Sequence, residues 1–447
     1  MKIAIISLGC PKNQVDADAM CHSLLLKGHT TTGDLSEADG ILVNTCGFIE
    51  SAKEEAIENI LMACSYKEQN PNLKVIVTGC LAERYKEQIR QEIPEVDAVV
   101  GIGSNKALPA ILDRVFGGEQ LESYGPKTDL PLGGKRVIST PRHYAYLKIA
   151  EGCNNHCHYC AIPGIRGPMR SRPLEDCLAE ARWLAGEGVR ELIVVAQDPT
   201  AYGEDMGKNQ IVELLEALDQ VEGLEWIRLL YAYPERITPQ LIQCMAKSKK
   251  ILPYLDLPIQ HCNDQVLKRM NRRSTKALLE DTIAQLRREI SGITLRTTLI
   301  AGFPGETQEQ FEELCQFVKD MKFDRLGCFA YSQEEHTVAA TYPYQLDEEE
   351  KQRRADVVMR IQSEIMAKKQ AAQVGRTLTV LCDGIDEESG LYLCRTQGDA
   401  PDIDGCVCVS SDQPLYPGDF YRVIIDESDM VDLFATFDPA LNGGDLQ

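Results

Sequence analysis

The sequence predicts an α/β protein of three parts: a Rossmann-like N-terminal domain, a partial (βα)6 barrel and a small C-terminal β-barrel. Over the first hundred residues, short apolar runs rich in β-branched residues alternate with helix-length patterns. The same alternation restarts near residue 144 for six further units, and after residue 376 only short strands broken by turns remain. At 447 residues the chain is also too long for one ordinary hydrophobic core.

The composition is that of a globular protein. Hydrophobic residues make up 44% of the chain and charged residues 26%, which excludes a disordered or fibrous chain. No apolar run reaches the roughly 18 residues that a membrane span needs. The apolar start ends at Pro11, without the long apolar stretch or the cleavage site of a leader peptide. We therefore expect a first β-strand there, and a cytoplasmic protein with no membrane partner.

The N-terminal domain is expected over residues 1–116. Four short apolar runs, each followed by a helical pattern, predict strands at residues 2–8, 40–44, 74–78 and 96–100. Strands that alternate with helices form βαβ units and hence a parallel sheet. Paired glycines at 117–118 and 133–134, with scattered prolines, predict a linker over residues 117–138.

The partial barrel is expected over residues 139–374. Its predicted strands are residues 144–150, 191–196, 226–231, 254–259, 293–300 and 325–331, and a charged helix over 347–373 ends the domain. In barrels of this kind the active site lies where the strands run into the loops that follow them.

The C-terminal part is expected over residues 375–440. Short strands at residues 378–382, 391–395, 405–410 and 421–425 fit only a small β-barrel. The last residues, 441–447, contain two adjacent glycines and are expected to form a frayed tail.

Three cysteines, Cys153, Cys157 and Cys160, lie in one short loop directly after the first barrel strand. A closed iron–sulfur site takes four cysteine ligands. Three thiolates would therefore hold three irons of a cubane [4Fe-4S] cluster and leave the fourth iron open to a small chelating ligand. Zinc is the alternative, with His156 or His158 as further ligands, although no second cysteine pair lies nearby.

A cysteine also follows each of the first three strands: Cys10, Cys46 and Cys80. The carboxyl ends of parallel strands meet at one edge of a sheet, where ligands of such folds bind. Three thiolates that converge there would hold a second cluster, again with one iron lacking a protein ligand. The alternatives are ordinary burial of the three cysteines or a zinc site, although zinc usually requires a close cysteine pair.

Five further residues are candidates for binding a small cofactor. Tyr159 directly precedes the last cysteine of the loop, and Gln197, Gln260 and Arg296 lie at or near barrel strands. Glu306 ends a Gly-Phe-Pro-Gly-Glu turn that follows a strand. Each has a simpler explanation: Tyr159 packs the loop, the three polar residues are satisfied core residues, and the turn is only a turn.

The charge of the chain is unevenly distributed. The net charge is −21, and from Arg376 to the end three basic and 15 acidic residues leave the C-terminal barrel at −12. Such a barrel would repel a nucleic-acid backbone and attract a basic protein; the alternative is that the charge serves only solubility. The basic run of Lys268, Arg269, Arg272 and Arg273 stands out and predicts a solvated helix end.

The two cysteine triads and the trailing β-barrel together resemble the methylthiotransferases of the radical-SAM superfamily over essentially the whole chain. That family joins an N-terminal cluster-binding domain, a radical-SAM core and a small barrel called TRAM. The local motifs are similar to those of the branch that modifies ribosomal protein uS12. They are Ser7-Leu8-Gly9-Cys10-Pro11-Lys12-Asn13, the runs 44–49, 151–163 and 255–261, and the pairs Gln197-Asp198 and Tyr202-Gly203.

This resemblance implies an enzyme with two [4Fe-4S] clusters on the six cysteines and with S-adenosylmethionine as a further cofactor. It implies transfer of a methylthio group to the β-carbon of an aspartate in uS12. The expected partners are that basic ribosomal protein and an electron donor such as a flavodoxin or ferredoxin. The alternatives are a transfer-RNA adenosine methylthiotransferase, which the acidic barrel disfavours, and a non-enzymatic iron–sulfur carrier.

Overall fold

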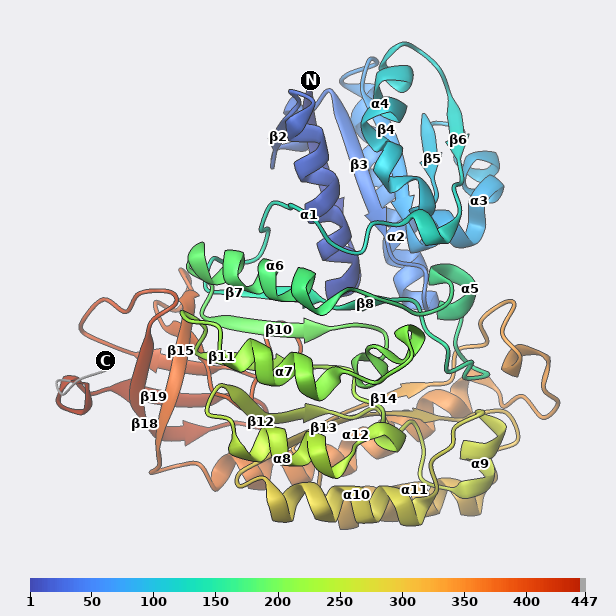
Figure 1. Cartoon of the computed structure of the whole chain (residues 1–447). Helices are drawn as coiled ribbons and strands as arrows, with labels where there is room; N and C mark the ends of the chain where they lie inside the picture. Colours follow the sequence, from blue (N-terminus) through green and yellow to red (C-terminus); the bar gives the residue numbers. More distant parts are fainter. Residues whose placement is uncertain (443–447) are drawn as a thin grey trace.

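The computed structural model describes residues 1–442, which fold into the three parts expected from the sequence (Figure 1). The N-terminal domain, blue to cyan in the figure, stands against one side of the central domain, and the red C-terminal barrel lies at one end of it. The predicted α/β fold class is confirmed. The final residues, 443–447, fall within the predicted frayed tail and lie outside the described part; a short 3-10 turn, Pro439–Leu441, precedes them.

The N-terminal sheet has six parallel strands in the order β2-β1-β3-β4-β5-β6. The strands are β1 (Lys2–Ser7), β2 (Thr30–Thr32), β3 (Gly40–Thr45), β4 (Lys74–Gly79), β5 (Ala98–Val100) and β6 (Leu121–Ser123). On one face α1 (Pro11–Leu26) and α4 (Leu108–Phe116) share a core with the sheet. On the other face α2 (Glu50–Ser65) and α3 (Cys80–Glu92) share a second core. The sheet is buried on both faces, as a parallel sheet requires.

The sequence pattern does not predict β2 and β6. Each has three residues, too few to show a periodicity of hydrophobic positions. Strand β6 pairs with β5, Leu121 lying opposite Ala98, and it lies inside the range 117–138 that the sequence predicts as a linker. That part of the chain therefore extends the first sheet before it crosses to the central domain.

The central domain is an open barrel of six parallel strands in sequence order. They are β7 (Tyr144–Lys148), β10 (Glu191–Val195), β11 (Trp226–Leu229), β12 (Ile251–Asp256), β13 (Thr294–Ala301) and β14 (Arg325–Ala330). The helices between them are α5 (Ile162–Arg166), α6 (Leu174–Gly186), α7 (Ile211–Asp219), α8 (Pro239–Lys247), α9 (Asp264–Arg269), α10 (Lys276–Glu289) and α11 (Gln308–Met321), and α12 (Glu348–Ala371) follows the last strand. No pairing joins β14 to β7 in the described sheet, so the barrel is partial, as predicted.

The C-terminal domain is a closed five-stranded barrel in the order β15-β16-β17-β19-β18. Its strands are β15 (Thr377–Ile385), β16 (Tyr392–Arg395), β17 (Val407–Ser410), β18 (Phe420–Ser428) and β19 (Leu433–Phe437). The sequence pattern predicts four of them and not β19, a short run directly after an acidic turn. Pairing of β19 with both β17 and β18 closes the barrel and leaves no exposed strand edge.

The C-terminal barrel is attached to the amino-terminal ends of the central strands through buried charges. Glu191, the first residue of β10, has no exposed surface and accepts hydrogen bonds from Arg228 (2.7 Å) and from Arg395 of β16 (2.6 Å). The Tyr254 hydroxyl donates to Asp404 (2.6 Å) at the same junction. Burial alone would raise the pKa of Glu191, but the two guanidinium groups outweigh it and lower that pKa below its usual value.

Within residues 1–442, no helix combines the length and the apolar composition needed to cross a bilayer.

Replacing Glu191 with Gln should lower the free energy of unfolding by about 3 to 5 kcal/mol, because Arg228 would remain buried without its carboxylate and Arg395 would keep only Asp383. Chemical denaturation of the full chain measures this. Glu225→Gln is the matched control, since Glu225 is exposed and its contact with Arg190 is 3.9 Å long. Because folding lowers the Glu191 pKa, its stabilisation is fully present above about pH 4.3 and is lost as the pH falls through the folded pKa. A wild-type and a Gln variant of equal stability at pH 7 would contradict the assignment.

Candidate active site

The first cysteine triad lies where the three central strands of the N-terminal sheet end. Cys10 caps the amino end of α1, Cys46 follows β3, and Cys80 is the first residue of α3. The loops pack very closely: a Cβ on Gly9, which has φ +90°, would lie 2.7 Å from the Cys46 Cβ, and one on Gly47 would lie 2.7 Å from the Leu81 Cα. Only glycine fits at these positions. The predicted meeting of the three cysteines at one sheet edge therefore has a structural basis.

Arg166 connects this triad to the central domain. It ends the short helix α5 (Ile162–Arg166) and is 2% exposed. Its Nε and Nη2 donate to the Cys80 Sγ at 3.3 and 3.2 Å. Burial raises the pKa of the Cys80 thiol to about 12 against the opposing effect of Arg166, and burial together with the Cys10 thiolate raises the pKa of Cys46. These sulfurs therefore need positive charge nearby to be held as thiolates.

The second cysteine triad lies on the loop after the two-residue strand β8 (Ala150–Glu151). The Cys153 Sγ accepts from the backbone N–H (3.5 Å) and the side-chain amide (3.4 Å) of Asn155. The Cys157 Sγ lies 2.6 Å from the Tyr233 hydroxyl, and the Cys160 N–H donates to the Cys157 carbonyl (3.0 Å). The loop thus supplies three sulfurs, with polar donors directed at two of them.

The chemistry of both donor sets fits iron–sulfur clusters. Burial raises the pKa of Cys153 to about 11 and also raises that of Cys160, so a bound cation would provide the charge that keeps these thiolates ionised. In the described part of the chain, no group of three Cys, His, Asp or Glu side chains is placed to hold a single metal ion. A cubane cluster makes a different demand, because each thiolate binds its own iron.

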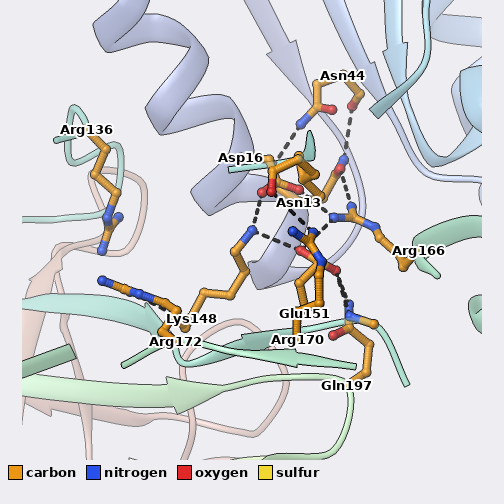
Figure 2. A network of polar contacts seen from close by, with 12 residues as sticks. Asn13, Asp16, Asn44, Arg136, Lys148, Glu151, Arg166, Arg170, Arg172 and Gln197 are labelled. Carbon is orange, nitrogen blue, oxygen red and sulfur yellow. Dashed lines mark hydrogen bonds and ion pairs between the residues drawn. The ribbon is translucent and has the colours of Figure 1, made fainter. Parts of the chain in front are cut away.

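A buried network of charges joins the two triads (Figure 2). Lys148, the last residue of β7, contacts Asp16 of α1 and donates to Glu151 (2.9 Å). Arg166 donates to the same two carboxylates, at 2.5 and 3.2 Å. The side chains of all four residues are at most 3% exposed. The network therefore links α1, which carries Cys10 at its start, to the strand end that precedes Cys153.

Glu151 is the centre of this network. Burial alone would raise its pKa, but Lys148 and Arg166 outweigh burial and lower the pKa to about 2. The carboxylate also accepts from the Gln197 side chain (2.6 Å) and so orients it. Glu151 is thus ionised at neutral pH and fixes the side chains around it.

Of the five candidate cofactor residues, Tyr159 belongs to the cysteine loop, Gln197 contacts the residue two positions before Cys153, and Gln260 lies after β12. Tyr159 packs against a cluster that includes Met270 and Phe303. Gln197 is held by Glu151, as above. Gln260 lies just after β12 with φ +70°, bridged by its backbone to the neighbouring strand β13, and is partly exposed. A non-glycine residue in this conformation is strained, which is common at functional positions.

The structure gives the other two candidates protein partners instead. The Arg296 guanidinium faces Asp256 (3.8 Å) and Asp404 of the C-terminal barrel (3.4 Å). Glu306 is 4% exposed and accepts from the Gly302 N–H (3.0 Å) and from Arg354 of α12 (2.7 Å). Both side chains thus join elements of the fold, because buried charges take the nearest opposite charge, and their contacts with a cofactor stay predictions.

Several residues at the site carry no recognisable signal in the sequence. Arg166 and Tyr233 contact cysteines that lie 86 and 76 positions away. Arg272, predicted as part of a solvated helix end, is 6% exposed and its guanidinium lies 3.9 Å from the centre of the Tyr233 ring. Only a charged residue in an otherwise apolar stretch, such as Lys148 in its strand, could have suggested a buried network.

The three parts of the chain match known families. Residues 2–101 match the uncharacterized protein family UPF0004, residues 147–318 the radical SAM superfamily and residues 374–437 the TRAM domain.

Among solved structures, the radical S-adenosylmethionine methyltransferase TsrM from Kitasatospora setae has a similar fold. Its TM-score is 0.55 at 12% identity, over 86% of this chain and 79% of that one. The cobalamin-dependent S-adenosylmethionine radical enzyme OxsB gives a TM-score of 0.52 at 11% identity, over 80% of this chain and 56% of that one. At these identities the likeness concerns the fold alone.

Curated relatives match over nearly the full length. The ribosomal protein uS12 methylthiotransferase RimO of Clostridioides difficile is 48% identical, over 97% of this chain and 98% of that protein. The enzyme of the same name from Acetivibrio thermocellus is 46% identical over 97% of both chains, and that from Lachnoclostridium phytofermentans is 47% identical over 98% of this chain and 100% of that one. With two cysteine triads on a radical-SAM fold and this degree of identity over its whole length, the chain belongs to the uS12 methylthiotransferase family of radical-SAM enzymes.

Proposed function

We propose that the protein transfers a methylthio group to the β-carbon of an aspartate in ribosomal protein uS12. The observation that carries the proposal is the pair of three-cysteine sites joined by one buried network. When bound, two [4Fe-4S] clusters and S-adenosylmethionine supply the substrate radical and the methylthio group. The six cysteines would hold the clusters, each on three thiolates.

The remaining residues bind and position. Arg166 and Asn155 donate to the sulfurs of Cys80 and Cys153 and favour their thiolate forms, and the Tyr233 hydroxyl hydrogen-bonds the Cys157 sulfur. Glu151 fixes Gln197, and we assign contacts with S-adenosylmethionine to Tyr159, Gln197 and Gln260. The network of Figure 2 keeps the two cysteine sites in a constant relation, which the transfer of a group between them requires.

We assign the cluster-binding domain to residues 1–116 together with strand β6 (Leu121–Ser123), the linker to the rest of 117–138, the radical-SAM core to 139–374 and the TRAM barrel to 375–440. A ribosomal protein as substrate, free or in the small subunit, supports a location in the cytoplasm, which we also propose.

The acidic barrel supports a basic protein as the substrate. Eight of its acidic residues are exposed: Glu387, Glu388, Asp402, Asp412, Asp419, Asp426, Glu427 and Asp429. Charge complementarity of this kind directs association and partner choice more than it adds affinity. Transfer RNA, the substrate of the alternative reaction, would meet like charge on the same surface.

A basic surface beside the cysteine loop supports an acidic electron donor such as a flavodoxin or ferredoxin. The Asn271 side chain donates to the carbonyl of exposed His156 (2.8 Å). Lys268 and Arg273 are exposed on this segment and have no ion-pair partner within the described residues. The exposed Tyr344 lies nearby in the segment that bonds to His158.

The cluster assignment predicts about eight irons per chain after anaerobic reconstitution, four for each cubane. Cys157→Ala should lower this to about four and abolish cleavage of S-adenosylmethionine, whereas Cys46→Ala should lower it equally but leave cleavage and stop sulfur transfer. Iron analysis and chromatography of 5'-deoxyadenosine measure both. Cys315→Ala, a partly buried thiol of α11, is the control and should keep all irons. Sulfur transfer by Cys46→Ala would refute the role of the first triad.

The substrate assignment predicts that the full chain binds purified uS12 but not transfer RNA at the same ionic strength. Replacing Glu387, Glu388, Asp426 and Glu427 with their amides should weaken uS12 binding about 10-fold at low salt, an effect that added salt removes. Glu54→Gln with Glu55→Gln, exposed on α2, is the control. Mass spectrometry of uS12 should then show an added methylthio group on one aspartate. Tight binding and methylthiolation of transfer RNA would instead favour the alternative.

The donor assignment predicts that Lys268→Glu with Arg273→Glu slows flavodoxin-driven cleavage of S-adenosylmethionine about 10-fold at low salt. Cleavage driven by dithionite needs no docking and should match the wild type. Lys247→Glu with Lys249→Glu, exposed at the end of α8, is the control. Equal slowing with both reductants would show that the charges serve the loop and not the donor.

A further inference from the structure

Lys12 is a buried cation close to the first cysteine triad. It is the second residue of α1, two positions after Cys10, and it is 8% exposed. Its ammonium group lies 3.4 Å from the centre of the Tyr231 ring. No carboxylate of the described residues comes within ion-pair distance of it. A buried charge in this state is costly unless a partner arrives from outside.

The other buried cations at the same domain junction differ from Lys12 in this respect. Lys148 and Arg166 share Asp16 and Glu151, and Arg136 contacts Asp18 (2.6 Å) and Glu180 (2.9 Å). Asp16 lies one turn after Lys12 on α1, yet its two oxygens are taken by Lys148 and Arg166. The junction therefore pairs every cation named here except Lys12.

Lys12 lies between the two cysteine sites. On its own helix it follows Cys10, and its aromatic neighbour Tyr231 is two residues from Tyr233, whose hydroxyl contacts Cys157. Two residues of extended chain span at most about 7 Å. Tyr231 has φ +69°, a strained conformation for a residue with a side chain. The ring that lies against the Lys12 ammonium group is therefore held by a strained backbone conformation.

The nearest alternative is that Lys12 only neutralises the Cys10 thiolate. Arg166 can already neutralise the thiolates of the first triad, since it donates two hydrogen bonds to the Cys80 sulfur. The nearby Asp256 accepts from the Tyr231 N–H (3.1 Å) through one oxygen and faces Arg296 (3.8 Å) with the other, and within residues 1–442 it lies beyond ion-pair distance of Lys12. The ammonium group keeps its capacity to bind an anion that enters between the triads.

We infer that Lys12 binds the side-chain carboxylate of the acceptor aspartate. The inference rests on the proposed function and deepens it. A carboxylate anchored on Lys12 holds its own β-carbon one bond away, between the two cysteine sites, where hydrogen removal and sulfur transfer must both reach it. An adenosine base has no carboxylate, so the same contact selects a protein substrate over transfer RNA.

The test compares two uS12 peptides, one with the acceptor aspartate and one with asparagine in its place, bound to the reconstituted full chain under anaerobic conditions. Wild-type protein should bind the aspartate peptide about 10- to 100-fold more tightly, as expected for a charge-assisted contact away from bulk water. In Lys12→Met this ratio should fall to about one, while Lys12→Arg should restore most of it. Fluorescence anisotropy of labelled peptide measures the affinities.

Lys135→Met, an exposed lysine of the segment between the domains, is the control and should keep the wild-type ratio. Iron content and unfolding temperature, measured for every variant, report damage to the cluster or the fold. A Lys12→Met protein that loses iron but keeps the wild-type aspartate preference would overturn the inference in favour of the neutralising role. Equal affinity of the wild-type protein for the two peptides would overturn this inference and leave the proposed function standing, whereas uS12 without an added methylthio group would overturn the proposed function.

Discussion

The buried network of Asp16, Lys148, Glu151 and Arg166 is the interaction on which the placement of both cysteine sites depends. Four charges removed from water are tolerable only when every one is paired, because a single missing partner leaves an uncompensated charge in a region of low dielectric. The network spans two domains, so their relative orientation is tied to complete pairing. A rigid junction is what a reaction shared between two sites demands, since a displacement of about 1 Å is costly in such chemistry.

Charge is used differently at the two ends of the central barrel. At the amino-terminal ends of its strands, Glu191 binds Arg395 of the C-terminal barrel, and Asp404 of that barrel binds Tyr254 of the central domain. The exposed acidic residues of the C-terminal barrel face solvent and can contact partners. At the junction with the N-terminal domain the excess is positive, with Arg166 and Lys12 near the buried thiols. An acidic protein thus carries a local cationic site where thiolates, and on our inference a carboxylate, have to be stabilised.

Much of the fold could be predicted, because alternation of apolar runs with helical patterns is a local property of the chain. The central strands of both parallel sheets and four strands of the last barrel were recognisable in this way. Strands β2, β6 and β19 were not, since they are short and exist through pairing with distant partners such as β5 and β17. Strand β6 lies inside the range 117–138, which the sequence pattern predicts as a linker, because its pairing with β5 leaves no signal in so short a segment.

The sequence by itself determined the chemistry of this protein: six cysteines, three in one loop and three at strand ends, with a spacing that residue type and local pattern suffice to interpret. Only the tertiary structure decided which charged residues serve those cysteines. Arg166 and Tyr233 contact sulfurs that lie more than 70 residues away in the sequence. Glu306 and Arg296 pair with other elements of the fold, and Lys12 has no carboxylate within ion-pair distance among residues 1–442. Electrostatic pairing depends on distance in space and on exclusion of water, and neither is written in the order of residues along the chain.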